Sequence, residues 1–246
     1  MTTPAASLSI VIPAFNESAR IGRTLQELRT WLSASASVES WEIRVVDDGS
    51  ADDTATIVEQ AASEDARVVL QREPHRGKGG AVRAGLLAAR GELRFLCDAD
   101  LSMPVGELSR FLAVVPAECD IAIGSREGAG AVRVGEPVYR HLMGRAFNAL
   151  VQTILLPGIN DTQCGFKLLT AQAVEAIFPA LTIDGWAFDL ELMFIARQQG
   201  WRVREIPIEW HYRDRSQVSP LADSWRMTRD LFRIRLNGAR RLGKRR

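Results

Sequence analysis

The sequence has few cysteines and no long apolar run. Its 246 residues include only Cys97, Cys119 and Cys164, which form no CxxC pair and no disulfide-like spacing. A disulfide framework is therefore excluded, and a reducing cytosol is expected. The longest apolar stretch, residues 146–156, is too short to span a bilayer, and the first seven residues lack the basic region of a signal peptide. We expect any membrane contact to be peripheral.

Two common phosphate-binding motifs are also missing. No GxGxxG follows the first apolar segment, which disfavours a dinucleotide-binding Rossmann domain. The segment His75–Gly80 contains Lys78, but it lacks the spacing and the Ser or Thr of a Walker A loop. Its glycines allow close backbone approach and Lys78 supplies positive charge, so a diphosphate is expected near this segment.

The composition is that of a globular protein. With 46% hydrophobic and 25% charged residues, the chain is not collagen-like, coiled-coil or wholly disordered. A chain of this length buries roughly 70–75% of its unfolded surface, so it can form a large core without disulfide or metal crosslinks. No Pro-, Gly- or Ser-rich linker and no internal repeat divides it. We therefore expect one domain, residues 1–215, followed by a basic C-terminal segment, residues 216–246.

The near-neutral net charge of +1 hides an asymmetry. Residues 201–246 carry 13 basic and 5 acidic side chains, whereas residues 1–200 carry 18 basic and 25 acidic ones. An acidic body with a basic end is typical of proteins that contact a polyanion, such as a membrane surface or a nucleic acid. A solvated terminal helix with a frayed basic end is the alternative.

The first half of the chain alternates between strand and helix patterns. Short apolar runs predict strands, and amphipathic or small-residue segments between them predict helices. This order indicates βαβ units and a mostly parallel, doubly wound α/β sheet flanked by helices. The expected strands are 8–13, 41–46, 67–70, 93–97, 121–124, 166–169 and 203–208, and the expected helices are 21–32, 52–62, 79–89, 139–155, 188–199 and 221–237.

Polar residues follow three of the predicted strands. Asp98, Ala99 and Asp100 come after the strand at 93–97, and residues two apart in extended backbone project to the same face. Two adjacent carboxylates repel each other unless a cation or protons intervene, and a hard divalent cation, Mg²⁺ or Mn²⁺, resolves that cost. Open α/β sheets bind ligands at this edge. An acidic surface turn is the alternative.

The other two strand ends add donors and acceptors at the same predicted edge. Asp47 and Asp48 end the strand at 41–46, where their carboxylates can accept hydrogen bonds from a base or ribose. A turn leading into a helix is the alternative for them. Pro13, Ala14, Phe15, Asn16 and Glu17 follow the first strand.

Taken together and in this order, the motifs resemble those of the inverting family 2 glycosyltransferases with the GT-A fold. Within them the chain is most similar to the dolichyl- or polyprenyl-phosphate sugar synthases, and to their glucosyl-transferring branch rather than the mannosyl one. The resemblance runs from residue 8 to about residue 231. It is carried by Ile12–Glu17, Val45–Ser50, Gly77–Gly79, Asp98–Asp100, Gly124–Arg126, Asp161–Lys167 and Trp186–Glu191.

The resemblance implies a role for each motif on the donor side. Residues 13–17 and Asp47 or Asp48 would hold the nucleotide, and Lys78 would lie near the diphosphate. Asp98 and Asp100 would bind the metal ion and the donor. Ser102 stands where some relatives carry a glutamine ligand, which leaves the third protein ligand of the metal undefined.

A lipid phosphate acceptor is already anionic near neutral pH, so it needs positioning by cations more than a strong general base. Guanidinium groups bind phosphate oxygens bidentately, which makes Arg126 and Arg140 candidates. Arg213 and Arg215 precede a Ser-Gln pair where relatives often have Ser-Lys, and they are further candidates. Surface ion pairing is the alternative for each arginine.

Two further carboxylates are candidates for the reacting centre. Asp161 lies in a motif that relatives use there, so the resemblance implies a catalytic carboxylate that acts as a base or orients the acceptor. Asp189 begins a predicted helix, where a favourable interaction with the helix dipole is the alternative role.

The basic C-terminal segment alternates apolar and basic residues between Trp225 and Leu236. Basic helices with aromatic residues lie at anionic membrane surfaces, although the apolar positions here form no single clean stripe, so some are expected to pack on the body.

We therefore expect a metal-dependent hexosyltransferase that moves glucose from UDP-glucose onto polyprenyl or dolichyl phosphate. It would act peripherally at the cytoplasmic face of a membrane, without a nucleic-acid partner. The alternatives are a mannosyltransferase that uses GDP-mannose, a family 2 transferase with a soluble or polysaccharide acceptor, and a non-catalytic nucleotide-sugar-binding module.

Overall fold

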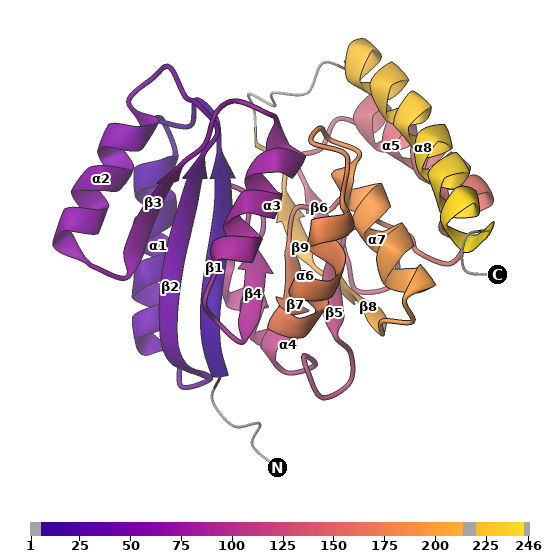
Figure 1. Ribbon diagram of the computed structural model, residues 1–246. Helices are drawn as coiled ribbons and strands as arrows, with labels where there is room; N and C mark the ends of the chain where they lie inside the picture. Colours follow the sequence, from indigo (N-terminus) through magenta and orange to yellow (C-terminus); the bar gives the residue numbers. More distant parts are fainter. Residues whose placement is uncertain (1–5, 214–219, 244–246) are drawn as a thin grey trace.

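A seven-stranded mixed sheet forms the centre of the molecule in a computed structural model, which describes residues 6–213 and 220–243 (Figure 1). Its strand order is β3-β2-β1-β4-β7-β5-β8. The central strands are buried on both faces, which explains their near-continuous Val, Ile and Leu content. The strands are β1 (Ala6–Ala14), β2 (Val38–Asp47), β3 (Val68–Arg72), β4 (Leu93–Leu96), β5 (Ile121–Ser125), β7 (Lys167–Thr170) and β8 (Val203–Pro207).

The sheet is mostly parallel, as expected from the alternating pattern, and the strand β7 is the exception. It runs antiparallel to both β4 and β5, whereas all other neighbours in the sheet are parallel. A four-residue apolar strand carries no sequence signal for its direction. Because β7 runs the opposite way, its first residue, Lys167, pairs with Leu96 at the end of β4. The loop that precedes β7 therefore lies at the edge where the parallel strands end.

Helices cover both faces of the sheet. On one face, α1 (Ile21–Ala34) buries Ile21, Leu25, Leu28 and Leu32, spaced as one stripe of a helix. The opposite face is covered by α3, α6 and α7, which pack into a second apolar cluster. The remaining bounds are α2 (Thr54–Glu64), α3 (Lys78–Ala88), η1 (Val105–Glu107), α4 (Leu108–Leu112), α5 (Val138–Ile154), α6 (Ala171–Ile177), η2 (Phe178–Ala180), α7 (Phe188–Gln198) and α8 (Pro220–Gly243).

Small residues allow α3 to pack closely on the sheet. A Cβ atom at Gly85 would lie 2.5 Å from side-chain atoms of both Val11 and Val46. The helix therefore approaches β1 and β2 at a distance that only glycine permits at this position. At the start of the helix, beside Lys78, a Cβ atom at Gly79 would lie 2.7 Å from Phe188 of α7, so this end of α3 is also closely packed.

Two strands were not anticipated from the sequence, and neither were the short helices η1, α4, α6 and η2. The short strands β6 (Val132–Val134) and β9 (Glu209–His211) pair in parallel as a separate two-stranded sheet. Each strand has only three residues, too few for a period-two pattern to be recognised.

The last helix, α8, carries two separate apolar stripes, which explains why its sequence shows no single clean one. Its inner stripe consists of Met227, Leu231, Ile234 and Gly238, and Leu231 and Ile234 are buried in the cluster that includes α7. A Cβ atom at Gly238 would lie 2.3 Å from the ring of Phe194 on α7. The outer stripe consists of Trp225, Phe232 and Leu236 and is exposed. No helix in the described part of the chain has the length and apolarity needed to cross a bilayer.

Candidate functional site

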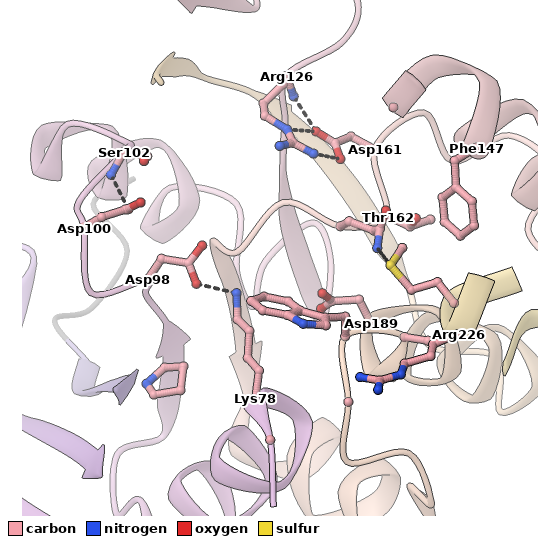
Figure 2. Close-up of a pocket in the computed structure, with 18 of the residues that line it drawn as sticks. Lys78, Asp98, Asp100, Ser102, Arg126, Phe147, Asp161, Thr162, Asp189 and Arg226 are labelled. Carbon is pink, nitrogen blue, oxygen red and sulfur yellow. Dashed lines mark hydrogen bonds and ion pairs between the residues drawn. The ribbon is translucent and has the colours of Figure 1, made fainter. Parts of the chain in front are cut away.

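One large cavity of about 1110 Å³ opens at the edge where the parallel strands end and β7 begins. It brings together residues from nearly every motif identified in the sequence. Figure 2 shows Lys78, Asp98 and Asp100 in one part of it and Arg126, Asp161 and Phe147 in another. We call these parts the carboxylate side and the arginine side.

The end of the carboxylate side is formed by the loops after β1 and β2. Pro13, Ala14 and Phe15 line it, and the Phe15 ring stacks on the His75 ring with 4.3 Å between centroids. The buried Asp48 carboxylate accepts hydrogen bonds of 2.9 Å from the backbone N–H groups of Arg76 and Gly77. This network joins the loop after β2 to the loop before α3.

Asn16 and Asp47 shape these loops but do not line the cavity. Asn16 adopts a positive φ of 54°, and its side-chain oxygen accepts a hydrogen bond from the Ala51 N–H at 2.8 Å. Asp47 is buried and accepts from the Ser50 N–H at 3.1 Å. For Asp47 the turn alternative describes the geometry, and of the aspartate pair only Asp48 reaches the cavity. Glu17 does line it, held by Arg20 at 2.8 Å.

Asp98, Ala99 and Asp100 line the cavity directly after β4. The Asp98 carboxylate is 2.6 Å from the Lys78 ammonium, and Asp100 accepts a hydrogen bond from the Ser102 N–H at 2.9 Å. Burial and the nearby Asp98 charge raise the pKa of Asp100. Burial disfavours the charged form of Lys78, but the carboxylates of Asp98, Asp189 and Asp100 outweigh it and raise the pKa of the ammonium.

Asp98 is held against a glycine in the loop before β7. A Cβ atom at Gly165 would lie 1.8 Å from one Asp98 carboxylate oxygen, so no other residue fits there without displacing the carboxylate. The antiparallel direction of β7 is what brings this loop to the end of β4. Gly165 therefore fixes the place of Asp98.

The carboxylate side has the donor set for a hard divalent cation. Asp98 and Asp100 are separated by one residue, and the pKa of Asp100 is raised. A cation stabilises two carboxylates in such an arrangement. Among residues 6–213 and 220–243, no group of three or more His, Cys, Asp or Glu side chains is placed to hold a metal ion. The residues thus fit an ion whose remaining ligands come from a substrate, as phosphate oxygens commonly supply for Mg²⁺.

Arg126 and Asp161 form a bidentate ion pair on the arginine side. Arg126 follows β5, and its Nε and Nη2 donate to the two Asp161 oxygens at 2.7 and 2.9 Å, while its backbone N–H donates to one of them at 3.0 Å. Burial opposes the charge on Asp161, but Arg126 outweighs it and lowers the pKa of the carboxyl. Of the two roles expected for Asp161, this geometry favours orientation over proton abstraction, because both oxygens are engaged.

Asp189 lies in the first turn of α7 and lines the cavity. Its carboxylate is 2.7 Å from the Nζ of Lys167, which is completely buried. Burial raises the pKa of Asp189, and the charges of Lys167 and Lys78 oppose that shift. The two lysines thus link Asp189 to Asp98 and to the start of β7.

Of the other three arginines expected to bind the acceptor, two line the cavity. Arg140 of α5 lines the cavity and donates to the Tyr212 hydroxyl at 2.9 Å. Arg213 is exposed and also lines it. Arg215 lies outside the described residues.

The cavity also includes residues of α8 that sequence reasoning assigned only to a membrane surface. Arg226, Arg229 and Arg233 line it, spaced three and four residues apart, so they share one face of the helix. That spacing was a readable signal, but the sequence alone did not show that this face turns inward. A hydrogen bond from Gln163 to the Met227 sulfur at 3.8 Å connects α8 to the loop before β7.

Sequence comparison with known proteins gives one family model and several relatives that agree with one another. The model of Glycosyl transferase family 2 matches residues 9–178. A dolichyl-phosphate beta-glucosyltransferase from Dictyostelium discoideum is 34% identical over 241 residues, covering 93% of this chain and 73% of the relative. The protein of the same name from Saccharomyces cerevisiae is 34% identical over 249 residues, covering 93% and 74% of the two chains.

Comparison with solved structures confirms the GT-A glycosyltransferase fold. Glucosyl-3-phosphoglycerate synthase from Mycobacterium tuberculosis, crystallised with Mn²⁺, uridine diphosphate and phosphoglyceric acid, superposes with a TM-score of 0.66. The match covers 94% of this chain and 78% of that chain at 17% identity. Likeness at this identity concerns the fold alone.

Proposed function

Because this chain belongs to glycosyl transferase family 2 and to the group of the dolichyl-phosphate β-glucosyltransferases, we propose that it transfers glucose from UDP-glucose to dolichyl or another polyprenyl phosphate. The observation that carries the proposal is the division of one cavity into a carboxylate side and an arginine side. The first suits a metal-bound sugar nucleotide, and the second suits an anionic acceptor.

The donor is proposed to occupy the carboxylate side. The uracil and ribose would lie between Phe15, His75 and Asp48, and Lys78 would approach the diphosphate. Asp98 and Asp100 would hold a Mg²⁺ or Mn²⁺ ion, which would neutralise charge on the departing UDP as a Lewis acid. The presence of Mn²⁺ and uridine diphosphate in a protein of the same fold supports this placement.

Transfer requires one bond to form and one to break. An acceptor phosphate oxygen attacks the anomeric carbon of glucose, and the bond from that carbon to the β-phosphate of UDP breaks with inversion. Because the phosphate is already anionic, no side chain has to remove a proton from it. The chain's contribution is to hold the two substrates in line, with Arg126 fixed by Asp161 and Arg140 fixed by Tyr212.

A membrane surface is proposed as the place of action, at its cytoplasmic face. Large apolar side chains are exposed on α5 and α8, two helices that also contribute residues to the cavity, and such a cluster is unusual for a surface that meets only water. Figure 1 shows α5 and α8 at the same end of the molecule. The exposed side chains are Val138, Tyr139, Leu142 and Met143 of α5 and Trp225, Phe232 and Leu236 of α8.

Purified protein incubated with Mn²⁺ and polyprenyl phosphate tests the proposal. We expect a lipid-linked hexose with labelled UDP-glucose and little product with GDP-mannose. Product with GDP-mannose alone would change the donor, and product with a soluble acceptor but no lipid would replace the acceptor class. Tight UDP binding without transfer to any acceptor would indicate a binding module instead.

Substituting Gly165 by alanine should disturb the donor site without unfolding the chain. The added Cβ would displace the Asp98 carboxylate, so we expect Mn²⁺-dependent UDP binding to weaken by at least tenfold. Gly106→Ala is the matched control, because a Cβ there meets nothing within 4 Å. Calorimetric titration of UDP with and without Mn²⁺ measures the effect. Equal affinities in the two variants would show that Asp98 does not hold the metal-bound donor.

A further inference from the structure

The helix α8 presents three distinct stripes. The inner one, with Leu231 and Ile234, is buried against the body, and the outer one, with Trp225, Phe232 and Leu236, is exposed. Between them lies the third, Arg226, Arg229, Asp230 and Arg233, and all four line the cavity. At 100° per residue these four positions fall on one side of the helix, next to the outer apolar stripe.

We propose that the arginine stripe of α8, Arg226, Arg229 and Arg233, binds the phosphate of the acceptor, so that α8 forms one wall of the acceptor site. The proposal rests on the proposed function, because it concerns the acceptor of that reaction. It assigns to α8 a role inside the cavity rather than a role only at the membrane surface.

The charge balance of the arginine side supports this assignment. Two of its arginines are committed to carboxylates: Arg126 to Asp161, and Arg133 to Glu127 and Glu136. A phosphate monoester carries up to two negative charges, so it needs positive charge beyond these neutralised pairs. The α8 stripe brings three further guanidinium groups to the wall of this cavity, and Asp230, which lies 3.3 Å from Arg229, lines the same wall.

The position of the stripe is fixed by packing. The buried Leu231 and Ile234 hold α8 on the body, and Gly238 lets it lie against Phe194. The contact between Gln163 and Met227 joins α8 to the loop that carries Asp161. In Figure 2 the Arg226 side chain extends from α8 into the cavity, toward the part where Asp189 lies. The arginines are thus set relative to the proposed reacting centre.

The arrangement of stripes favours a lipid phosphate over a soluble one. The exposed apolar stripe begins next to the arginine stripe, with Trp225 73% and Leu236 63% exposed. A molecule with an anionic head and an apolar chain can place the head at the arginines and the chain along the outer stripe. A soluble phosphate ester would leave that apolar stripe uncovered.

Glutamine substitutions of Arg226 and Arg233, singly and together, test the proposal. A hydrogen bond to a charged group contributes roughly 1.5–3 kcal/mol, or about 10- to 100-fold. We expect each single variant to raise KM for a short, water-soluble prenyl phosphate by at least about tenfold, with KM for UDP-glucose unchanged. Arg226→Lys, which keeps the charge, should recover part of the loss.

Arg235→Gln is the matched control, because it removes the same charge from the same helix at a position that lines a different groove. It should leave KM for the soluble prenyl phosphate unchanged. If the Arg226 and Arg233 variants lose only binding to anionic vesicles and keep KM for the soluble acceptor, the stripe is a membrane contact and the proposal is overturned.

Direct binding separates this proposal from the proposed function. Prenyl phosphate and inorganic phosphate are titrated into each variant without donor. If the wild type binds prenyl phosphate through the stripe but transfers no sugar, the proposed function fails and the inference stands. If inorganic phosphate binds as tightly as prenyl phosphate, the stripe recognises the phosphate of a soluble molecule, and its assignment to a lipid phosphate fails. Equal binding of prenyl phosphate by all variants overturns the inference itself.

Discussion

Replacing Asp100 by asparagine is expected to abolish transfer and to leave the fold intact. The substitution removes one of the two carboxylates, Asp98 and Asp100, that line the carboxylate side and that we propose to hold the metal ion. A metal ion supplies several kcal/mol of charge stabilisation in the transition state, and about 4 kcal/mol corresponds to roughly 10³-fold in rate. The lipid-linked product formed per unit time measures the effect.

The same substitution has a distinct effect on stability. Burial and Asp98 raise the pKa of Asp100, so the ionised carboxylate at neutral pH opposes folding when no cation is bound. The asparagine variant should therefore melt at or above the wild-type temperature without metal, and Mn²⁺ plus UDP should raise its melting temperature less. Asp53→Asn, at the start of α2 and outside the cavity, is the control. Full activity of the Asp100 variant would refute its role at the metal.

Replacing Arg126 by glutamine is expected to eliminate transfer and to destabilise the protein as well. The change leaves the Asp161 carboxylate buried without its partner, which typically costs about 3–5 kcal/mol. For a chain of this length each kcal/mol lowers the melting temperature by roughly 2–4 °C. Arg72→Gln, which breaks an exposed pair with Glu59, should change little.

A double substitution distinguishes structure from chemistry at this pair. Arg126→Gln combined with Asp161→Asn removes both charges, so we expect most of the stability to return. Transfer should stay abolished, because the Arg126 guanidinium, which we propose orients the acceptor, is still missing. Recovery of transfer together with stability would show that the pair serves only the fold.

The pair of Arg126 and Asp161 also predicts how the stability of the fold changes with pH. The pKa of Asp161 is lower in the folded protein than the ordinary value near 3.9, so the pair stabilises the fold above that value and loses this contribution as pH falls through the folded pKa. In acid melts the wild type should lose stability more steeply than the double variant.

The sequence predicted the strands and most helices because their burial follows local periodicity. The buried residues of α1 recur at helical spacing, and β1 contains an apolar run from Ile10 to Ala14. The direction of β7 and the pairing of β6 with β9 depend instead on partners distant in the sequence. No periodicity within three or four residues encodes those partners.

The same distinction holds for the candidate site: local sequence patterns predicted some of its features, and others depend on residues brought together by folding. Asp98 and Asp100 were recognisable because two carboxylates follow an apolar strand. A turn at Asp47 was one of the two alternatives read from the sequence, but the pairing of Asp161 with Arg126 was not, because the two residues are 35 positions apart and are brought together by folding. The arginines of α8 were visible as a basic stripe, but only packing decides which way it faces.

The order of strands in the sheet has a consequence for how such enzymes diversify. Most of the carboxylate side comes from the chain up to Asp100, although Gly165 and Asp189 of the later chain contact or influence it, and the arginine side comes from the chain after β5, including α5, β9 and α8. If the two sides bind donor and acceptor as we propose, the two substrates are recognised largely by consecutive parts of one polypeptide. Substitutions in α5, β9 or α8 would then alter acceptor binding and leave most of the donor side unchanged.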